Sequence, residues 1–514
     1  MKRINVFCLL LMAILPGYAQ VPESPVSPRK DHTSQVITVD PSHSWGPWDG
    51  WGSSLAWWGR AIGGSDNADL YADLIYTTEN IRVGGKHYPG LGFNIARYNV
   101  GGGGINQPLE RKSPRNPWHR DMHSYWQEPE NADSSRSGWN WKLDANQRSM
   151  MAMAKLRGAN RFEMFSDSPP WWMNKNHSTA GSDTGGDCLE PAHYDQFVEY
   201  LAVVAKYARE HWAVNFESLE PFNEPSADWW KFPGSQEGCH FDVATQRTVI
   251  PKLRNALDVA GLGKVLIATS DENSVDVALD TWNKFGDSTH SLVGALNVHG
   301  YFSGTHTNRG ANMPLLHAAT GGSRRLWMSE YGDDDASGLT MARSILQDIR
   351  RLRPTAWIYW QPVEPELSGW GLINATYMEN SDDGKRAIST PLTRINRKFF
   401  VLGQFTRYIR EGFQMIDVDE QNSIAAYDSN AHQLVIITLN EEGARWVRYD
   451  LSRFSRVGST VTRIATTTAP GKDVPDYEEK EQPKLKTNGP QGKGFESFFY
   501  PNMVQTFILG GVYP

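Results

Sequence analysis

Strand-like and helix-like segments alternate from Trp48 to about Arg394, and this alternation constrains the fold more than any other feature of the sequence. The clearest helical segment is 194–212, where apolar residues recur at the spacing of one helix face. Alternating strands and helices predict an α/β fold with a parallel sheet, and eight such units close most simply into a (β/α)8 TIM barrel. The eight candidate strands end near Ser54, Asn99, Ser166, Asn223, Thr269, His299, Glu330 and Gln361.

The periodicity changes after a last predicted helix over 393–409. Short apolar runs then follow one another at even spacing with turns between them, which predicts a C-terminal all-β sandwich. An isolated strand within 35–47 is expected to complete that sandwich. The predicted domains are the strand segment 35–47, a barrel over 48–394, and a sandwich over 395–514 that has the last barrel helix at its start.

The N-terminus has the pattern of a secretory signal over 1–19. Two basic residues, Lys2 and Arg3, precede a short apolar run from Val6 to Leu15, and small residues follow at the expected cleavage site. The apolar run is too short to span a bilayer. We therefore expect an exported, periplasmic or extracellular protein, with a flexible Pro- and Ser-rich leader over 20–34.

The net charge and the aromatic content indicate which classes of molecule the protein could bind. The formal net charge is −7 and no basic run is present, which argues against nucleic acid and membrane surfaces as partners. Twenty tryptophans are many, and flat aromatic rings suit sugar binding, although most large rings are expected in the core. Asp333–Asp335 lacks the ligand spacing of a calcium loop, so a solvated loop is favoured there. We expect a monomer with no metal and no cofactor.

Two cysteines, Cys188 and Cys239, remain once the signal is removed. In an oxidising compartment they are expected to form a disulfide that joins the loops after the third and fourth strands. Two buried free thiols are the alternative.

Two glutamates stand where strands end. Glu224 lies in the segment 218–225, and Pro225 favours an extended backbone for it because the proline ring restricts the preceding residue. Glu330 ends a second apolar run over 325–332. Surface loop charges are the ordinary interpretation of one such residue. A pair at strand ends, among many tryptophans, favours a two-carboxylate glycosidase on a β/α barrel.

Six motifs, taken in order, resemble glycoside hydrolase family 30, and among its branches the endo-β-1,6-galactanases. The resemblance covers nearly the whole mature chain. The Asn-Glu-Pro motif alone is shared by many barrel glycosidases, whereas the full set at strand ends is specific. The motifs are Gly52–Trp58, Asn94–Gly102, Ser168–Met173, Pro221–Pro225, Asn297–Tyr301 and Ser329–Gly332.

The resemblance implies a retaining hydrolase that cleaves β-1,6-galactan, with Glu224 as general acid/base and Glu330 as nucleophile. It implies that Arg97 supports the nucleophile, which needs a lowered pKa beside an acid with a raised one. Asn223 resembles a residue that binds the sugar 2-hydroxyl. The full set of substrate-binding residues predicted here is Asn223, Arg97, Asn99, Trp57, Trp171, Trp172, Trp229, His299, Tyr301 and Trp360.

Other candidates have equally good structural interpretations. In each of the adjacent pairs Trp57–Trp58 and Trp171–Trp172, one ring could contact sugar while the other packs in the core. Asp271 and Glu272 could bind a hydroxyl or form a salt bridge. Glu364 and Glu366 could reach an outer subsite.

Three rival specificities belong to the same family: β-1,6-glucan, glucuronoxylan and a glucosyl lipid. A glucuronate-binding enzyme is expected to carry a basic cluster in its late loops, and 367–378 has none. A secreted glycan-binding protein without activity is the non-enzymatic alternative, which the two glutamates disfavour.

Overall fold

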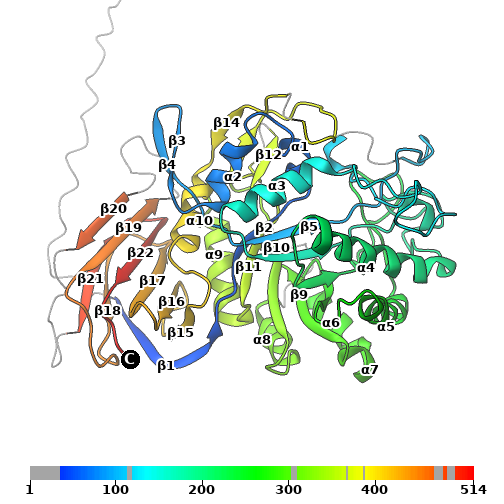
Figure 1. Ribbon diagram of the computed structural model, residues 1–514. Helices are drawn as coiled ribbons and strands as arrows, with labels where there is room; N and C mark the ends of the chain where they lie inside the picture. Colours follow the sequence, from blue (N-terminus) through cyan, green and yellow to red (C-terminus); the bar gives the residue numbers. More distant parts are fainter. Residues whose placement is uncertain are drawn as a thin grey trace, which may run out of the picture.

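The computed structural model describes residues 35–112, 118–301, 309–365, 369–385, 388–467, 478–482 and 493–514. The predicted signal over 1–19, the leader over 20–34 and Glu366 lie outside these residues. The described chain forms a barrel and a β module beside it (Figure 1). No helix among the described residues is long and apolar enough to cross a membrane.

Eight parallel strands close into a barrel in the order β10-β11-β2-β5-β6-β7-β8-β9, which confirms the predicted fold class. Each strand ends within three residues of the position expected from the sequence. The strands are β2 (Gly50–Ser54), β5 (Ile95–Asn99), β6 (Arg161–Phe165), β7 (Ser218–Glu220), β8 (Leu266–Glu272), β9 (Val293–His299), β10 (Arg325–Tyr331) and β11 (Ala356–Tyr359).

Helices surround the barrel, and α4 shows why they form. Its buried residues Phe197, Leu201, Val204 and Ala208 line one face, and this face packs inward. The helices are α1 (Trp58–Ile62), α2 (Ala68–Tyr76), α3 (Ala145–Leu156), α4 (Tyr194–His211), α5 (Val243–Val259), α6 (Val275–Phe285), α7 (Asp287–His290), α8 (Arg309–Ala319), α9 (Leu339–Gln347) and α10 (Arg397–Thr406), with short 3-10 helices η1 (Trp118–Arg120), η2 (Trp171–Met173) and η3 (Pro191–His193) and a π-helix η4 (Asp348–Leu352).

The helix predicted over 393–409 begins later than expected. Leu392–Ile395 is instead a strand, β14, which pairs antiparallel with β13 (Ile373–Ala375), and α10 follows after Asn396. Beside β13 lies β12 (Val363–Pro365), and a separate hairpin is formed by β3 (Asn80–Val83) and β4 (Lys86–Pro89).

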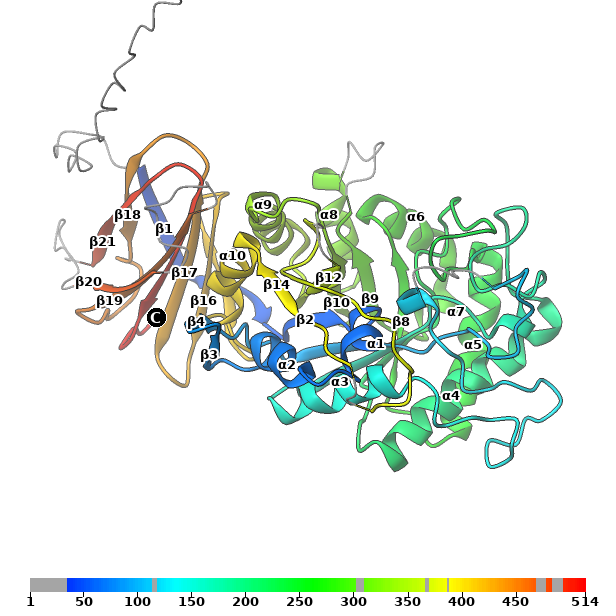
Figure 2. The ribbon, with the colours of Figure 1, turned by 90° about the horizontal axis from the view of Figure 1, so that it is seen from above.

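The β module has two layers that share the N-terminal strand β1 (Gln35–Pro47). Residues 35–38 of β1 pair in parallel with β18, and residues 39–47 pair antiparallel with β15, so β1 passes from one layer to the other (Figure 2). Tyr449, Phe495 and Phe507 meet between the layers. The remaining strands are β15 (Gln414–Val418), β16 (Ser423–Asp428), β17 (Gln433–Asn440), β18 (Arg445–Asp450), β19 (Val461–Thr467), β20 (Glu478–Gln482), β21 (Gly494–Phe499) and β22 (Met503–Leu509).

Helix α10 joins the barrel to the β module. Gln404 donates to Thr466 Oγ1 at 2.8 Å, and its carbonyl accepts from Thr506 Oγ1 at 2.8 Å. On another part of the boundary, Arg350 of η4 donates to the carbonyls of Val418 and Ser423. These buried polar contacts hold the module beside the barrel wall, away from the carboxyl ends of the barrel strands.

Candidate active site

Two barrel strands deliver Glu224 and Glu330 to the same end of the barrel. Glu330 lies within β10. Glu224 follows β7 in a turn with a φ of +47°, a conformation that side chains other than glycine rarely adopt. Its N–H donates to the carbonyl of Asp271 at 2.9 Å, and its carbonyl accepts from Trp230 Nε1 at 3.0 Å. These bonds fix the turn, and with it the direction of the Glu224 side chain.

The two carboxylates lie close enough for a retaining mechanism. His299 Nδ1 is 3.1 Å from Glu224 Oε1 and 3.5 Å from Glu330 Oε1. One oxygen of each carboxylate and this nitrogen all lie within 4.8 Å of one another. Retaining glycosidases place the two carboxyl groups about 5–5.5 Å apart, whereas inverting enzymes leave about 6.5–9.5 Å for a water. The geometry therefore favours a covalent intermediate over direct attack by water.

The carboxylates around His299 favour its protonated form. Burial lowers the pKa of its imidazole, but Glu330 and Asp271 outweigh burial and hold the pKa well above its usual range. His299 therefore acts as a buried positive charge between the two carboxylates.

Burial raises the pKa of Glu330 to about 7, and neighbouring Glu224 raises it as well, against the opposing effects of His299 and Arg97. Arg97 does lower the pKa of Glu330, as expected for a supporting arginine, but burial has the larger effect in the free enzyme. Arg97 Nη1 lies 3.7 Å from Glu330 Oε2, too far for a hydrogen bond. Tyr301 makes the direct contact, since its hydroxyl donates to Glu330 Oε1 at 2.8 Å.

Arg97 instead belongs to an ion network beneath the site. Its guanidinium donates to Glu163 at 2.8 Å, to Asp271 at 2.5 Å and to the Ser329 carbonyl at 3.0 Å. Although burial raises the pKa of Asp271, Arg97 and His299 hold it well below the usual range. Asp271 is thus a salt-bridge residue, and the network fixes β5, β8 and β10 relative to one another.

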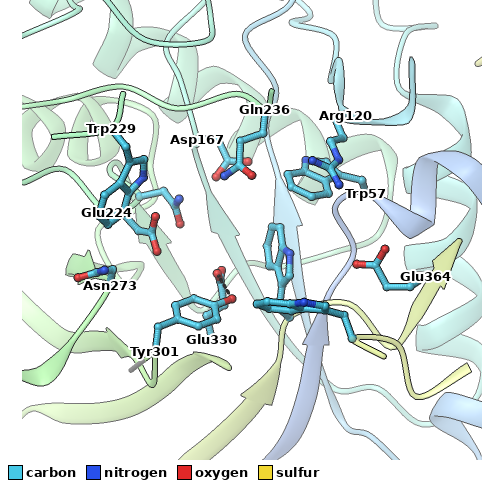
Figure 3. Close-up of a pocket in the computed structure, with 13 residues that line it drawn as sticks. Trp57, Arg120, Asp167, Glu224, Trp229, Gln236, Asn273, Tyr301, Glu330 and Glu364 are labelled. Carbon is cyan, nitrogen blue, oxygen red and sulfur yellow. Dashed lines mark hydrogen bonds between the residues drawn. The ribbon is translucent and has the colours of Figure 1, made fainter. Parts of the chain in front are cut away.

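A cavity of about 380 Å³ opens above the two glutamates (Figure 3). Asn223 lines this cavity, and its buried Oδ1 has no hydrogen-bond partner among the described residues. Trp229 is 47% exposed beside Glu224. The lining residues are Trp57, Arg120, Asp167, Asn223, Glu224, Trp229, Gln236, Asn273, Tyr301, Glu330, Trp360, Glu364 and Trp370.

Comparison with known proteins identifies the family. The family model O-Glycosyl hydrolase family 30 matches residues 34–333, more than half of the chain. An Endo-beta-1,6-galactanase from Hypocrea rufa is 42% identical over 483 residues, covering 93% of this chain and 95% of the relative. The chain belongs to glycoside hydrolase family 30.

More distant proteins are similar to this chain in sequence or in fold. An Exo-beta-1,6-galactobiohydrolase from Bifidobacterium longum subsp. longum is 25% identical and covers 82% of this chain, which spans 36% of that protein. A conserved exported protein from Bacteroides fragilis shares the fold with a TM-score of 0.75 at 18% identity, covering 92% of this chain and all of that one. The catalytic domain of a xylanase from Talaromyces cellulolyticus, classed in family 30, has a TM-score of 0.65 at 16% identity, with the same coverage.

The structure of this glycoside hydrolase separates the predicted site residues into groups. Trp57, Asn223, Trp229, Tyr301 and Trp360 line the cavity with the two glutamates. Arg97, Asn99 and His299 are fully buried beneath it and do not line it. Asn99 donates to Asp167 at 2.9 Å, so it positions a lining residue.

The second tryptophan pair, Trp171 and Trp172, does not line the cavity, which corrects the prediction that both bind substrate. Trp172 is a core residue, because its indole N–H donates to the Trp126 carbonyl and its ring meets the Trp126 ring at 5.0 Å. Trp171 packs on the backbone of Gly104, where a Cβ atom would lie 2.0 Å from Trp171 Nε1. Glu272 also points away, to Ser226 and Thr281.

Five lining residues were not predicted: Arg120, Asp167, Gln236, Asn273 and Trp370. Asp167 follows the end of β6 by two residues and Asn273 directly follows β8, so the strand-end rule could have found both. The other three come from long loops, whose positions the strand pattern does not specify.

The predicted disulfide between Cys188 and Cys239 is not formed. Both residues are buried free cysteines. Burial, and the adjacent Cys188, raise the pKa of the Cys239 thiol well above its usual range, so the thiol form is favoured. The two thiols contact the carbonyls of Gly186 and His240 instead.

The predicted solvated loop at Asp333–Asp335 is partly structural. Asp333 pairs with buried Lys398 at 3.0 Å, and Asp335 accepts the N–H of Thr340 in the first turn of α9. These carboxylates therefore position the segment that follows β10.

Proposed function

We propose that this enzyme hydrolyses β-1,6-galactosidic linkages in β-1,6-galactan, the side chains of arabinogalactan, by double displacement. The observation that carries the proposal is the 42% identity to an Endo-beta-1,6-galactanase over 93% of this chain, a span that includes both glutamates and the loops around them. A relative named for β-1,6-linked galactobiose release supports the same linkage.

The first step forms a glycosyl-enzyme. Glu330 attacks the anomeric carbon with a carboxylate oxygen, while the Tyr301 hydroxyl, which donates to Glu330 Oε1 at 2.8 Å, helps to orient the carboxylate. Glu224 gives its proton to the departing oxygen of the next sugar. This step requires a protonated Glu224 and an ionised Glu330 at its start.

The second step releases the sugar. Glu224, now ionised, takes a proton from a water that attacks the anomeric carbon and displaces Glu330. The buried imidazolium of His299 faces both carboxylates, so it favours whichever of them carries the negative charge. Two inversions leave the product with the original β configuration.

The enzyme acts outside the cytoplasm as a monomer. The pattern of residues 1–19 supports export, and the negative net charge fits a neutral polysaccharide substrate better than an anionic surface. N-terminal sequencing of the exported protein should find a start near Gln20, and intact Met1 on that protein would contradict export by cleavage.

A digestion series tests the substrate. β-1,6-Galactan, β-1,6-glucan and glucuronoxylan are each incubated with the enzyme, and the products are sized over time. We expect fast release of reducing ends from galactan alone, with a β-configured first product. A mixture of intermediate sizes early in the reaction indicates internal cleavage, whereas disaccharide alone from the start indicates action at chain ends. Faster cleavage of glucan or xylan would overturn the proposal.

A further inference from the structure

Two oppositely charged side chains, Arg120 and Glu364, line the end of the cavity that lies away from Glu224. In Figure 3, Glu224, Trp229 and Asn273 lie on one side of Glu330, and Trp57, Arg120 and Glu364 lie on the other. Neither charged residue has a part in the hydrolysis described above.

The Arg120 guanidinium lies over an aromatic ring, and its Nε has no hydrogen-bond partner among the described residues. It ends η1, in the loop between β5 and α3, and its guanidinium carbon lies 4.4 Å from the centre of the Trp57 ring. Arg120 Nε and Trp57 Nε1 are both buried without a hydrogen-bond partner among the described residues. Burial lowers the pKa of Arg120, against the opposing effect of Glu364.

The backbone of Glu364 is fixed by its neighbours, and its carboxylate is unpaired among the residues that the structure describes. Its backbone pairs with Asn374 in β13, and a Cβ atom at Gly371 would lie 2.9 Å from Glu364 Cβ. Within the described part of the chain its carboxylate makes no hydrogen bond and no ion pair within 4.0 Å. Burial raises its pKa to about 7, and Arg120 is the neighbour that opposes this rise.

Charged groups in partly buried positions normally have hydrogen-bond partners, because leaving them unpaired costs stability. A carboxylate and a guanidinium that line one cavity, and that have no partner among the described residues, are complementary to a ligand with several hydroxyls. A sugar fits this pair, because its hydroxyls donate to Glu364 and accept from Arg120. An acidic sugar fits less well, since Glu364 would repel its carboxylate.

The position of the pair identifies which sugar it holds. Glu224 protonates the leaving group, so the released part of the chain lies on the Glu224 side, and the sugar that precedes the cleaved residue lies on the other side. We propose that Arg120 and Glu364 bind that preceding neutral sugar and make the enzyme selective for a disaccharide unit on the non-reducing side of the cleaved bond. This inference rests on the proposed function and specifies its substrate further.

Paired aryl substrates test the proposal. An aryl β-galactoside fills only the site of the cleaved sugar, whereas an aryl β-1,6-galactobioside also fills the site next to it. The ratio of kcat/KM for the two substrates is measured for wild type, Glu364→Gln and Arg120→Met. Glu379→Gln and Arg394→Met are matched controls, since both residues are exposed on nearby segments and do not line the cavity.

We expect each cavity variant to lose about 10- to 100-fold in kcat/KM on the disaccharide substrate, because hydrogen bonds to charged groups are lost. Activity on the monosaccharide substrate should change less than about threefold, and the controls should keep the wild-type ratio. An unchanged ratio, or an equal loss on both substrates as a purely structural role predicts, overturns the inference. Faster cleavage of a glucuronate-capped aryl galactoside than of the neutral disaccharide also overturns it.

The same ratio in the glucose series separates this inference from the proposed function. If the wild type cleaves only aryl glucosides and β-1,6-glucobiosides, galactan is the wrong substrate. The ratio of kcat/KM for the aryl glucobioside to that for the aryl glucoside then still tests Arg120 and Glu364, because the two substrates differ only in the second sugar.

Discussion

The interior of the barrel and the interior of the β module are built from different residues. Beneath the active site, Arg97, Glu163, Asp271 and His299 are fully buried and bonded to one another. The apolar cluster at the barrel centre is small and consists of Ile95, Trp327, Ala356 and Ile358. Between the layers of the β module, by contrast, aromatic and aliphatic side chains form one continuous apolar cluster.

The ion network in the barrel serves function, whereas the apolar cluster in the β module serves stability. Burying an ion network costs desolvation that its own attractions offset only when every partner is present, whereas burying apolar surface stabilises directly. Barrel interiors are usually filled by layers of branched apolar residues. The charges in this barrel are best explained by the site above them, since they orient β10 and hold a positive charge near two carboxylates. Among the described residues of the β module, the interior is an apolar cluster without a comparable buried ion network.

Replacing Arg97 with Met should give the largest combined effect. The change leaves Glu163 and Asp271 buried without their cation, and we expect a loss of about 3–5 kcal/mol in unfolding free energy together with a large fall in kcat. Phe507→Ala in the module core should lose a similar stability, about 3–5 kcal/mol, through the cavity that it leaves. At a temperature where Phe507→Ala is fully folded, its kcat on galactan should match wild type, and a comparable fall in both variants would remove the distinction between the two interiors.

The pH dependence of stability should show an intermediate effect. Glu330 has a pKa of about 7 in the folded enzyme and near 4.5 when unfolded, so only the folded state holds this proton between those pH values. Stability therefore falls as pH rises through this window, and the full cost of the buried charge is present above pH 7. Glu330→Gln should gain about 1–3 kcal/mol over wild type at pH 8 and little at pH 4. Urea unfolding at both pH values measures this, with Glu379→Gln as a control that should follow wild type; a gain independent of pH would contradict it.

The boundary between the two domains should show the smallest effect. Arg343 of α9 contacts Glu441 of the module through two nitrogens, but the arginine side chain is half exposed. Arg343→Ala should cost about 0.2–1 kcal/mol in thermal unfolding, and less at high salt. A loss above about 2 kcal/mol would mean that the domain boundary, and not the two interiors, controls stability.

The sequence predicted the parts of this molecule that depend on strand position. Glu224 and Glu330 could be located because each follows an apolar run that must end at the same face of a barrel. The burial of Trp172 and the free thiols at Cys188 and Cys239 could be given only as alternatives, because both depend on which loops pack together. Arg120 and Trp370 were missed for the same reason. The pKa of Glu330 depends on the balance between burial and nearby charges, and no motif reports that balance.

The assignment of Glu224 as acid/base and Glu330 as nucleophile is tested most directly by the products formed with azide. Each glutamate is replaced with Ala, and an aryl β-1,6-galactobioside with an acidic phenol is supplied, because such a leaving group needs little protonation. Glu224→Ala should still form the glycosyl-enzyme, and azide should then displace Glu330 to give a β-galactosyl azide. Glu330→Ala should instead let azide attack the substrate directly and give the α-azide. The reverse pair of products, α from Glu224→Ala and β from Glu330→Ala, would show that the two roles are exchanged.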